Sequence, residues 1–211
     1  AFAAEQGLPI DFEVGANRSF TDVVQAADAL ITTSVAEGFG LAFLEPWLMG
    51  RPLVGRDLPE VTPALRREGV SRDALYEQVR VPVTWVGRER LQDRVASALG
   101  QIYTAYAALM PDHAVERAMN HLVVDDRVDF GRLDETMQRD VIQRLVGDMD
   151  SRSGIDPSGP TARYPSPDVV GANREVVEQR FGLDGYGRRL LQRYEALLSA
   201  PCSGAVEALP P

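Results

Sequence analysis

Lysine is missing from this sequence of 211 residues, so all 22 basic side chains are arginines. The absence excludes Schiff-base chemistry on a lysine amine and excludes a P-loop, and it leaves arginine as the only permanently cationic side chain for binding phosphate. Cysteine is nearly missing as well. Cys202 is the single one and lies in a tail of Pro, Ser, Gly and Ala, so no internal disulfide can form. This cysteine usage fits a reducing compartment, and we expect a cytoplasmic protein.

Long apolar runs are also absent, because no segment approaches the length of a transmembrane helix. The formal net charge of -9 argues against general affinity for nucleic acid or for anionic membranes, although a local basic site could still hold a phosphate. The apolar content of 45% is typical of a globular domain. The length suggests one domain or somewhat more.

The prediction of the fold starts from the stretch between Thr33 and Gly55, TSVAEGFGLAFLEPWLMGRPLVG. The short apolar run that precedes it predicts a buried strand, and Gly38 and Gly40 predict a tight loop. The residues from Leu41 to about Gly50 have the apolar spacing of a helix that packs on a sheet. The sequence PLVG then predicts the next strand.

Upstream, the alternation of apolar residues in Pro9–Gly15 predicts a strand, and Phe20–Ala27 reads as a short helix capped by Ser19 or Thr21. Together with the strand at Ala29–Thr33, this gives alternating strands and helices, which predicts parallel pairing with right-handed crossovers. Ligands of such sheets bind outside the carboxyl ends of the strands, where the glycine loop lies.

Downstream, the pattern weakens but still predicts several elements. They are strand-like residues within Leu75–Val86, helices at Arg88–Leu109 and Asp134–Val146, a Pro/Gly/Ser-rich linker or lid at Ser151–Asp168, and closing helices at Asn173–Phe181 (with Asn173 as N-cap and Gly182 as C-cap) and Tyr186–Leu198.

The glycine loop and two glutamates suggest a binding site. Free backbone N–H groups and the positive end of a helix at the mouth of the sheet favour an anion such as a diphosphate. Glu37 and Glu45 bracket the loop, and carboxylates there can accept hydrogen bonds from the hydroxyls of a sugar or ribose. The residues therefore describe a pocket for a ligand with both phosphate and hydroxyl groups, although the glycines alone fit a plain tight turn equally well.

The segment EGFGLAFLE, Glu37 to Glu45, resembles the E-x7-E signature of retaining, nucleotide-sugar-dependent glycosyltransferases of family four, which have the GT-B fold. A strand ending in Thr-Ser precedes it, and GRPLV after it is similar to the family's G-x-P-V-V. Asp28 matches the family's acidic residue before the strand. The closing helices NREVVEQRFGLDGYGRRLLQRYEALL also resemble those of the family. Similarity covers about Asp11 to Glu60 and the last helices.

This resemblance implies an α/β fold with a Rossmann-like parallel sheet flanked by helices, the C-terminal half of a GT-B fold truncated at its N-terminus, with extra helices at its C-terminal side. It implies that Glu37 contacts hydroxyls of the transferred sugar and acts as the catalytic residue. It implies that Glu45 holds the ribose and that Ser34 lies near the same mouth. The backbone that lines the sugar and diphosphate would belong to Gly38, Phe39, Gly40 and Leu41. The substrate would be a nucleotide-diphosphate sugar, with no cofactor and no required metal.

Two departures from the family pattern concern the phosphates. The family places an Arg and a Lys upstream as a diphosphate clamp, and neither is identifiable here. Where the family has a Gly-Gly pair, this chain has Arg56-Asp57-Leu58-Pro59 before Glu60. Arg56 could supply a cation to the donor, and a surface salt bridge of Arg56 with Asp57 or Glu60 is at least as plausible.

The expected organisation is a partial donor-binding core at 1–110, a variable helical and loop insertion at 111–168, closing helices at 169–198 and a flexible tail at 199–211. The first residues read as the end of a helix, so the chain is expected to be a piece of a longer enzyme that is inactive alone. Its partner would be a missing N-terminal acceptor domain, through which peripheral membrane contact could occur; neither nucleic acid nor a transmembrane segment is expected.

Alternatives remain open. The chain could belong to a GT-B sugar phosphorylase or a nucleotide-sugar epimerase, or could be a non-catalytic module that binds sugar nucleotides or partner proteins. The D-x-D spacing at Asp148–Asp150 is interpreted as a solvated helix end, because it does not follow a strand. His113 and His121 lack companions at metal-ligand spacing and are interpreted as surface or packing histidines.

Overall fold

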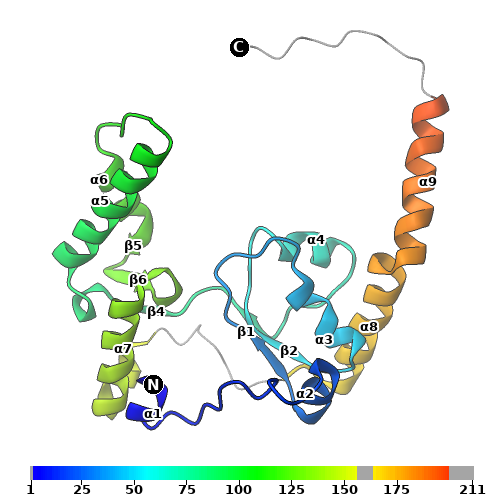
Figure 1. Ribbon diagram of the computed structural model, residues 1–211, viewed down its shortest axis with the longest axis horizontal. Coiled ribbons are helices and arrows are strands. Elements are labelled where there is room, and N and C mark those ends of the chain that lie inside the picture. Colours follow the sequence, from blue (N-terminus) through cyan, green and yellow to red (C-terminus); the bar gives the residue numbers. More distant parts are fainter. Residues whose placement is uncertain (1, 156–163, 200–211) are drawn as a thin grey trace.

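Two small sheets organise the fold in this computed structural model, which describes residues 2–155 and 164–199 (Figure 1). The first sheet is parallel, with the order β1-β2-β3, and the second is antiparallel, with the order β4-β6-β5. Each sheet has its own hydrophobic core, and the two cores share no residue. The described part of the chain therefore forms two packing units.

The first unit is a Rossmann-like arrangement of short parallel strands and helices. Leu30 pairs with Leu53, and Gly55 with Leu75, so each strand lies beside the next one in sequence. Its elements are α2 (Phe20–Ala26), β1 (Leu30–Thr32), η1 (Leu41–Phe43), α3 (Glu45–Leu48), β2 (Leu53–Arg56), α4 (Thr62–Arg67), β3 (Leu75–Tyr76) and α8 (Pro167–Phe181). The parallel pairing predicted for β1 and β2 is confirmed.

Close pairing of β1 and β2 depends on one glycine. Gly55 has φ +129°, and a Cβ at this position would overlap the backbone of Thr32 on the neighbouring strand. Only glycine fits this conformation and this separation.

The second unit is a helical layer around a β-hairpin. Its elements are β4 (Arg80–Pro82), η2 (Val83–Trp85), α5 (Arg88–Ala105), α6 (Ala114–Leu122), β5 (Val123–Val124), β6 (Arg127–Asp129), η3 (Phe130–Arg132), α7 (Glu135–Gly147) and η4 (Met149–Gly154). At the chain's start, α1 (Phe2–Glu5) lies beside α7, where the Arg139 guanidinium is 5.2 Å from the centroid of the Phe2 ring. Helix α5 packs in this second core. The boundary between the two packing units therefore lies between residues 76 and 80, whereas the sequence predicted a donor-binding core at 1–110.

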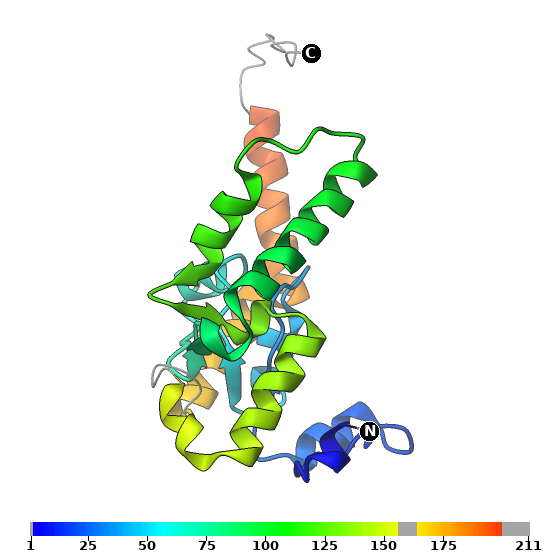
Figure 2. The ribbon, with the colours of Figure 1, turned by 90° about the vertical axis from the view of Figure 1, so that its left-hand side faces the viewer.

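The last helix, α9 (Leu183–Ser199), continues from α8 and projects away from both units (Figure 1). A view turned by 90° shows the same projection, with α9 rising clear of the sheets (Figure 2). The closing helix predicted at Tyr186–Leu198 is therefore confirmed, with a start three residues earlier.

The strand predicted at Pro9–Gly15 is wrong. These residues form coil and a turn, and the side chains of Ile10, Phe12 and Val14 are all exposed. Glu13 has φ +59°, a left-handed conformation that breaks an extended strand. Alternation of apolar residues specifies a strand only where a neighbouring strand supplies hydrogen bonds and a core covers one face.

Two helix predictions also need correction. The helix expected from Leu41 to Gly50 is divided into η1 and α3, because Pro46 has no N–H to bond with the carbonyl of Ala42. Asn173, expected as an N-cap, lies in the middle of α8, which begins earlier with Ser166 as its N-cap. By contrast, Ser19 caps α2 as predicted.

Candidate functional site

The loop after β1 carries most of the residues that the sequence nominated, and it lies at the carboxyl end of the parallel sheet. Glu37 is half-buried on this loop, and the Phe39 side chain is 94% exposed. Leu41 begins η1 and is exposed. Within residues 2–155 and 164–199, the carboxylates of Glu37 and Glu45 form no ion pair and no hydrogen bond with the protein.

The two glycines of the loop differ in what surrounds them. Gly40 is left-handed, with φ +70°, and the space for its Cβ is filled by the side chain of Val61. Gly38 has no atom within 4 Å of where its Cβ would be. The explanation that glycine admits a ligand to the backbone therefore applies to Gly38, whereas Gly40 serves the packing of the loop on the segment before α4.

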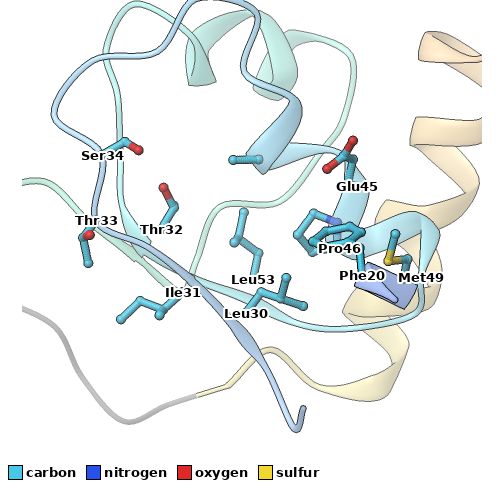
Figure 3. Close-up of a pocket in the computed structure, with 11 residues that line it drawn as sticks. Phe20, Leu30, Ile31, Thr32, Thr33, Ser34, Glu45, Pro46, Met49 and Leu53 are labelled. Carbon is cyan, nitrogen blue, oxygen red and sulfur yellow. The ribbon is translucent and has the colours of Figure 1, made fainter. Parts of the chain in front are cut away.

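A cavity of about 380 Å³ lies beside this loop (Figure 3). One wall is the end of β1 with its continuation, where Thr32, Thr33 and Ser34 carry hydroxyl groups, and the other wall includes Glu45 at the start of α3. The apolar part is formed by Phe20, Leu30, Ile31, Ala42, Pro46, Met49 and Leu53. The structure thus brings Ser34 and Glu45 to one cavity, whereas Glu37 and Phe39 do not line it.

The arrangement can hold a flat or apolar group against the leucines and proline while a half-buried carboxylate accepts hydrogen bonds from hydroxyls. The sequence predicted the positive end of one helix from Leu41 to about Gly50 at this loop. The helix dipole there is smaller, because η1 has three residues and α3 has four. Charge stabilisation of an anion would therefore depend more on the loop's N–H groups and on nearby arginines.

Arg56 does not form the surface salt bridge with Asp57 or Glu60 that the sequence suggested. It is buried at the end of β2, and its Nη1 donates to Asp129 Oδ1 at 3.0 Å while Nη2 donates to Oδ2. Asp129 ends β6, so the pair joins the two units. This hydrogen bond raises the pKa of Arg56 and outweighs the opposing effect of burial.

A second cavity of about 260 Å³ lies where the two units meet, at the carboxyl ends of β2 and β3. Its lining residues include Val35 from the first loop, the arginines Arg56, Arg72 and Arg132, and the carboxylates Asp57, Glu60 and Glu77. Asp57 accepts hydrogen bonds from Arg72 and from the Thr62 hydroxyl. Cations and carboxylates balance in number here, so the cavity has no excess of positive charge for a phosphate.

Sequence reasoning did not identify Asp129, Arg72 or Tyr76 as partners near the site. Burial, the largest effect, raises the pKa of Tyr76, and the positive charge of Arg56 opposes the increase. Arg56 and Asp129 are 73 positions apart, and no local pattern links two residues at that separation. The Asp125-Asp126 pair flanked by valines could have predicted the β5–β6 hairpin, since both aspartates have positive φ as in a tight two-residue turn.

The minor candidates lie apart from the cavities. Asp148 caps η4 by accepting hydrogen bonds from the Asp150 N–H and the Ser151 hydroxyl, which fits its interpretation as a helix end. The His113 side chain is exposed, and its Nδ1 lies 3.1 Å from Glu116 Oε2. No group of three or more His, Cys, Asp or Glu residues in the described ranges is placed to hold a metal ion. None of the helices described here is long and apolar enough to cross a bilayer.

Comparisons with known proteins give no assignment: no family model, no curated protein and no solved structure matches this chain. The fold and the two cavities are therefore the basis for any functional conclusion.

Proposed function

We propose that the chain is the donor-binding part of a retaining glycosyltransferase with the GT-B fold, and that its ligand is a nucleotide-diphosphate sugar. The observation that carries the proposal is the position of Glu45, a half-buried carboxylate facing the cavity at the carboxyl end of the parallel sheet. This is where α/β proteins bind nucleotides. Its spacing from Glu37 is that of the E-x7-E signature.

In this proposal the apolar part of the cavity receives the base, and Glu45 accepts hydrogen bonds from the ribose hydroxyls. Ser34, on the opposite wall, can donate to a ribose or phosphate oxygen. The diphosphate would lie along the loop, where Gly38 leaves the backbone open, and the sugar would extend toward Glu37. An acceptor would approach from the solvent side of the loop, where the Phe39 side chain is exposed.

The reaction would transfer the glycosyl group with retention of anomeric configuration. Charge develops on the diphosphate as the glycosidic bond breaks, and the loop's N–H groups stabilise it by electrostatics. Neither cavity contains an excess of cations, so we expect weak binding of the diphosphate.

Isothermal titration calorimetry with UDP, GDP, UDP-glucose and GDP-mannose tests the proposal. We expect heat with one nucleotide and its sugar, and a loss of affinity of about 10-fold or more in Glu45→Gln, because a hydrogen bond to a charged group contributes about 1.5–3 kcal/mol. Glu116→Gln makes the same charge change on the exposed surface of α6 and should leave the affinity unchanged. Absence of heat with all four ligands would overturn the proposal.

A further inference from the structure

Among the described residues, α9 carries seven exposed large apolar side chains. Five side chains form a continuous stripe along this helix, which we call the α9 stripe: Leu183, Tyr186, Leu190, Tyr194 and Leu197. All five are exposed, from 37% for Leu190 to 88% for Leu183. Leu191 and Leu198 border the stripe and are exposed as well. An unpaired apolar face of this size on a helix marks an interaction surface.

The stripe does not face the rest of the chain. Gly185 is the buried residue of α9, and a Cβ there would overlap the carbonyl of Gln179 in α8. At 100° per residue, Gly185 lies on the side of the helix opposite the stripe. Arg189 also turns toward α8, where its guanidinium donates to the carbonyl of Arg180. The contacts that hold α9 therefore leave the whole stripe to solvent.

The order of residues in the stripe is the same in both directions. Leucine and tyrosine alternate as Leu-Tyr-Leu-Tyr-Leu, with Tyr186 and Tyr194 four positions from Leu190, and Leu183 and Leu197 seven positions from it. Two such helices related by a two-fold axis at Leu190 would place Leu183 opposite Leu197, Tyr186 opposite Tyr194, and Leu190 opposite itself. This self-complementarity is what an isologous interface requires.

We propose that α9 is the interface of a symmetric dimer, in which the stripe packs antiparallel against the stripe of a second copy of this chain. The dimer is independent of the function proposed for the cavity. The partner helix has room, because the 17 residues of α9 span about 25 Å and, beyond their contact with α8, stand clear of the parallel sheet (Figures 1 and 2).

Gly187 is compatible with this pairing. It lies at the edge of the stripe between Tyr186 and Leu190, with no atom within 4 Å of its absent Cβ, so a side chain of the second copy can approach the backbone there. A glycine inside an exposed helix otherwise destabilises it relative to alanine. Arg188 and Gln192 lie on the polar face of α9, opposite the stripe. Both side chains therefore stay in solvent when the stripes pair.

The area is sufficient for association. A stable interface buries at least about 1,000 Å² in total. Each copy contributes seven large apolar side chains, and full burial of one such side chain removes roughly 60–120 Å² from solvent. The stripes of two copies can therefore bury about the area that a stable interface needs, without any contribution from the rest of the surface.

Sedimentation equilibrium of the 211-residue protein tests the dimer. We expect a dimer at about 100 μM and a monomer for Leu190→Asp at the same concentration, because this change places two like charges at the two-fold axis. Gln192→Asp is the matched control on the polar face and should remain a dimer. Far-UV circular dichroism of each variant establishes that α9 stays helical. A monomeric wild type, or a dimer that persists in Leu190→Asp, would overturn the proposal.

Disulfide trapping in a Cys202→Ser background tests the antiparallel register. Leu190→Cys should cross-link to itself. Leu183→Cys and Leu197→Cys should each stay uncross-linked alone and should cross-link when mixed. Cross-linking of Leu183→Cys alone would show a parallel pair and overturn the proposal. So would monomeric protein that sediments with vesicles of phosphatidylcholine and phosphatidylserine, because the stripe would then bind a membrane.

Discussion

Arg56 at the end of β2 is held through both of its terminal nitrogens by the carboxylate of Asp129 at the end of β6. Asp129 is 4% exposed and Arg56 7%, so the pair is shielded from water. Asp129 also accepts hydrogen bonds from the backbone N–H groups of Val79 and Gly131. One carboxylate therefore fixes the end of the parallel sheet against the hairpin of the second unit.

Removing the carboxylate charge should destabilise the protein strongly. Asp129→Asn keeps the shape of the side chain but leaves Arg56 buried without a counter-charge, which costs about 3–5 kcal/mol in the free energy of unfolding. Urea denaturation measures this change. Glu135→Gln breaks the exposed pair with Arg139 and should cost no more than about 0.5 kcal/mol. Equal effects of the two substitutions would contradict the role given to Asp129.

The same pair should make the two units unfold together. Trp47 is buried in the first core, and Trp85 packs against the second, so each unit contains one tryptophan. The variants Trp47→Phe and Trp85→Phe each leave one fluorescent probe. We expect coincident urea transitions of the two probes in the presence of Asp129 and separated transitions with Asp129→Asn added. Separate transitions already with the native Asp129 would show that the pair does not couple the units.

The two glycines of the loop should respond differently to the same substitution. Gly40→Ala forces a left-handed alanine against Val61 and should reduce the free energy of unfolding by about 1–3 kcal/mol. Gly38→Ala meets no neighbouring atom, so its stability should stay within about 0.5 kcal/mol of wild type. Thermal or urea denaturation of both variants measures this contrast.

Ligand binding separates their functional roles. If the loop binds a diphosphate, Gly38→Ala should weaken the calorimetric response to the nucleotide while the protein keeps its stability, because the added methyl group blocks the backbone N–H groups. An unchanged response in Gly38→Ala would remove the loop from the binding site but would leave the structural role of Gly40 intact.

Tyr76 should give stability a dependence on alkaline pH. Its folded-state pKa is raised, chiefly by burial, so the unfolded chain loses the phenolic proton first, at a pH of about 10. The stabilisation from Tyr76 is therefore complete below that pH and is lost as the pH rises through the folded-state value. Between about pH 9 and 11, the free energy of unfolding should fall more steeply in the wild type than in Tyr76→Phe. Tyr106→Phe removes a tyrosine that is 81% exposed and serves as the matched control.

The sequence predicted the parts of the fold that local chemistry determines. Ser19 caps α2 as predicted, and the helix predicted from Asp134 begins at Glu135, where Asp134 is the N-cap and accepts from the Met137 N–H. The failures involve residues whose conformation depends on distant partners. Ile10 and Phe12 alternate like a strand but have no strand beside them. Arg56 looked like a surface residue because nothing near it in sequence points to Asp129.

The candidate site shows the same division. The spacing of Glu37 and Glu45 predicted a common mouth, and in the structure Glu45 lines the cavity together with Ser34. Glu37 lies outside the cavity lining, on the loop whose Gly40 packs on Val61, a contact between two separate segments of the chain. Local spacing identifies the loop, whereas the direction of each side chain depends on tertiary contacts that the spacing does not contain.

Asn173 was predicted to cap a helix and instead connects α8 to the loop before β3. The Ser71 N–H donates to Asn173 Oδ1 at 2.8 Å, and Asn173 Nδ2 donates to the Ser71 carbonyl at 3.1 Å. The asparagine is 2% exposed, so water cannot replace it. Asn173→Ala leaves two backbone groups without partners, and we expect a loss of about 2–4 kcal/mol in the free energy of unfolding by urea denaturation.

A neighbouring substitution provides the control for Asn173. Arg174→Ala lies one position along α8 and removes an exposed pair with Glu178, so it should cost about 0.5 kcal/mol or less. Asn173→Asp keeps the acceptor for the Ser71 N–H and loses only the donor, but it buries a charge beside the Ser71 carbonyl. We therefore expect Asn173→Asp to be as destabilising as alanine near neutral pH and to recover stability on acidification, as the carboxyl becomes a donor. A wild-type stability of Asn173→Ala would show that packing of α8, rather than this amide, holds the loop.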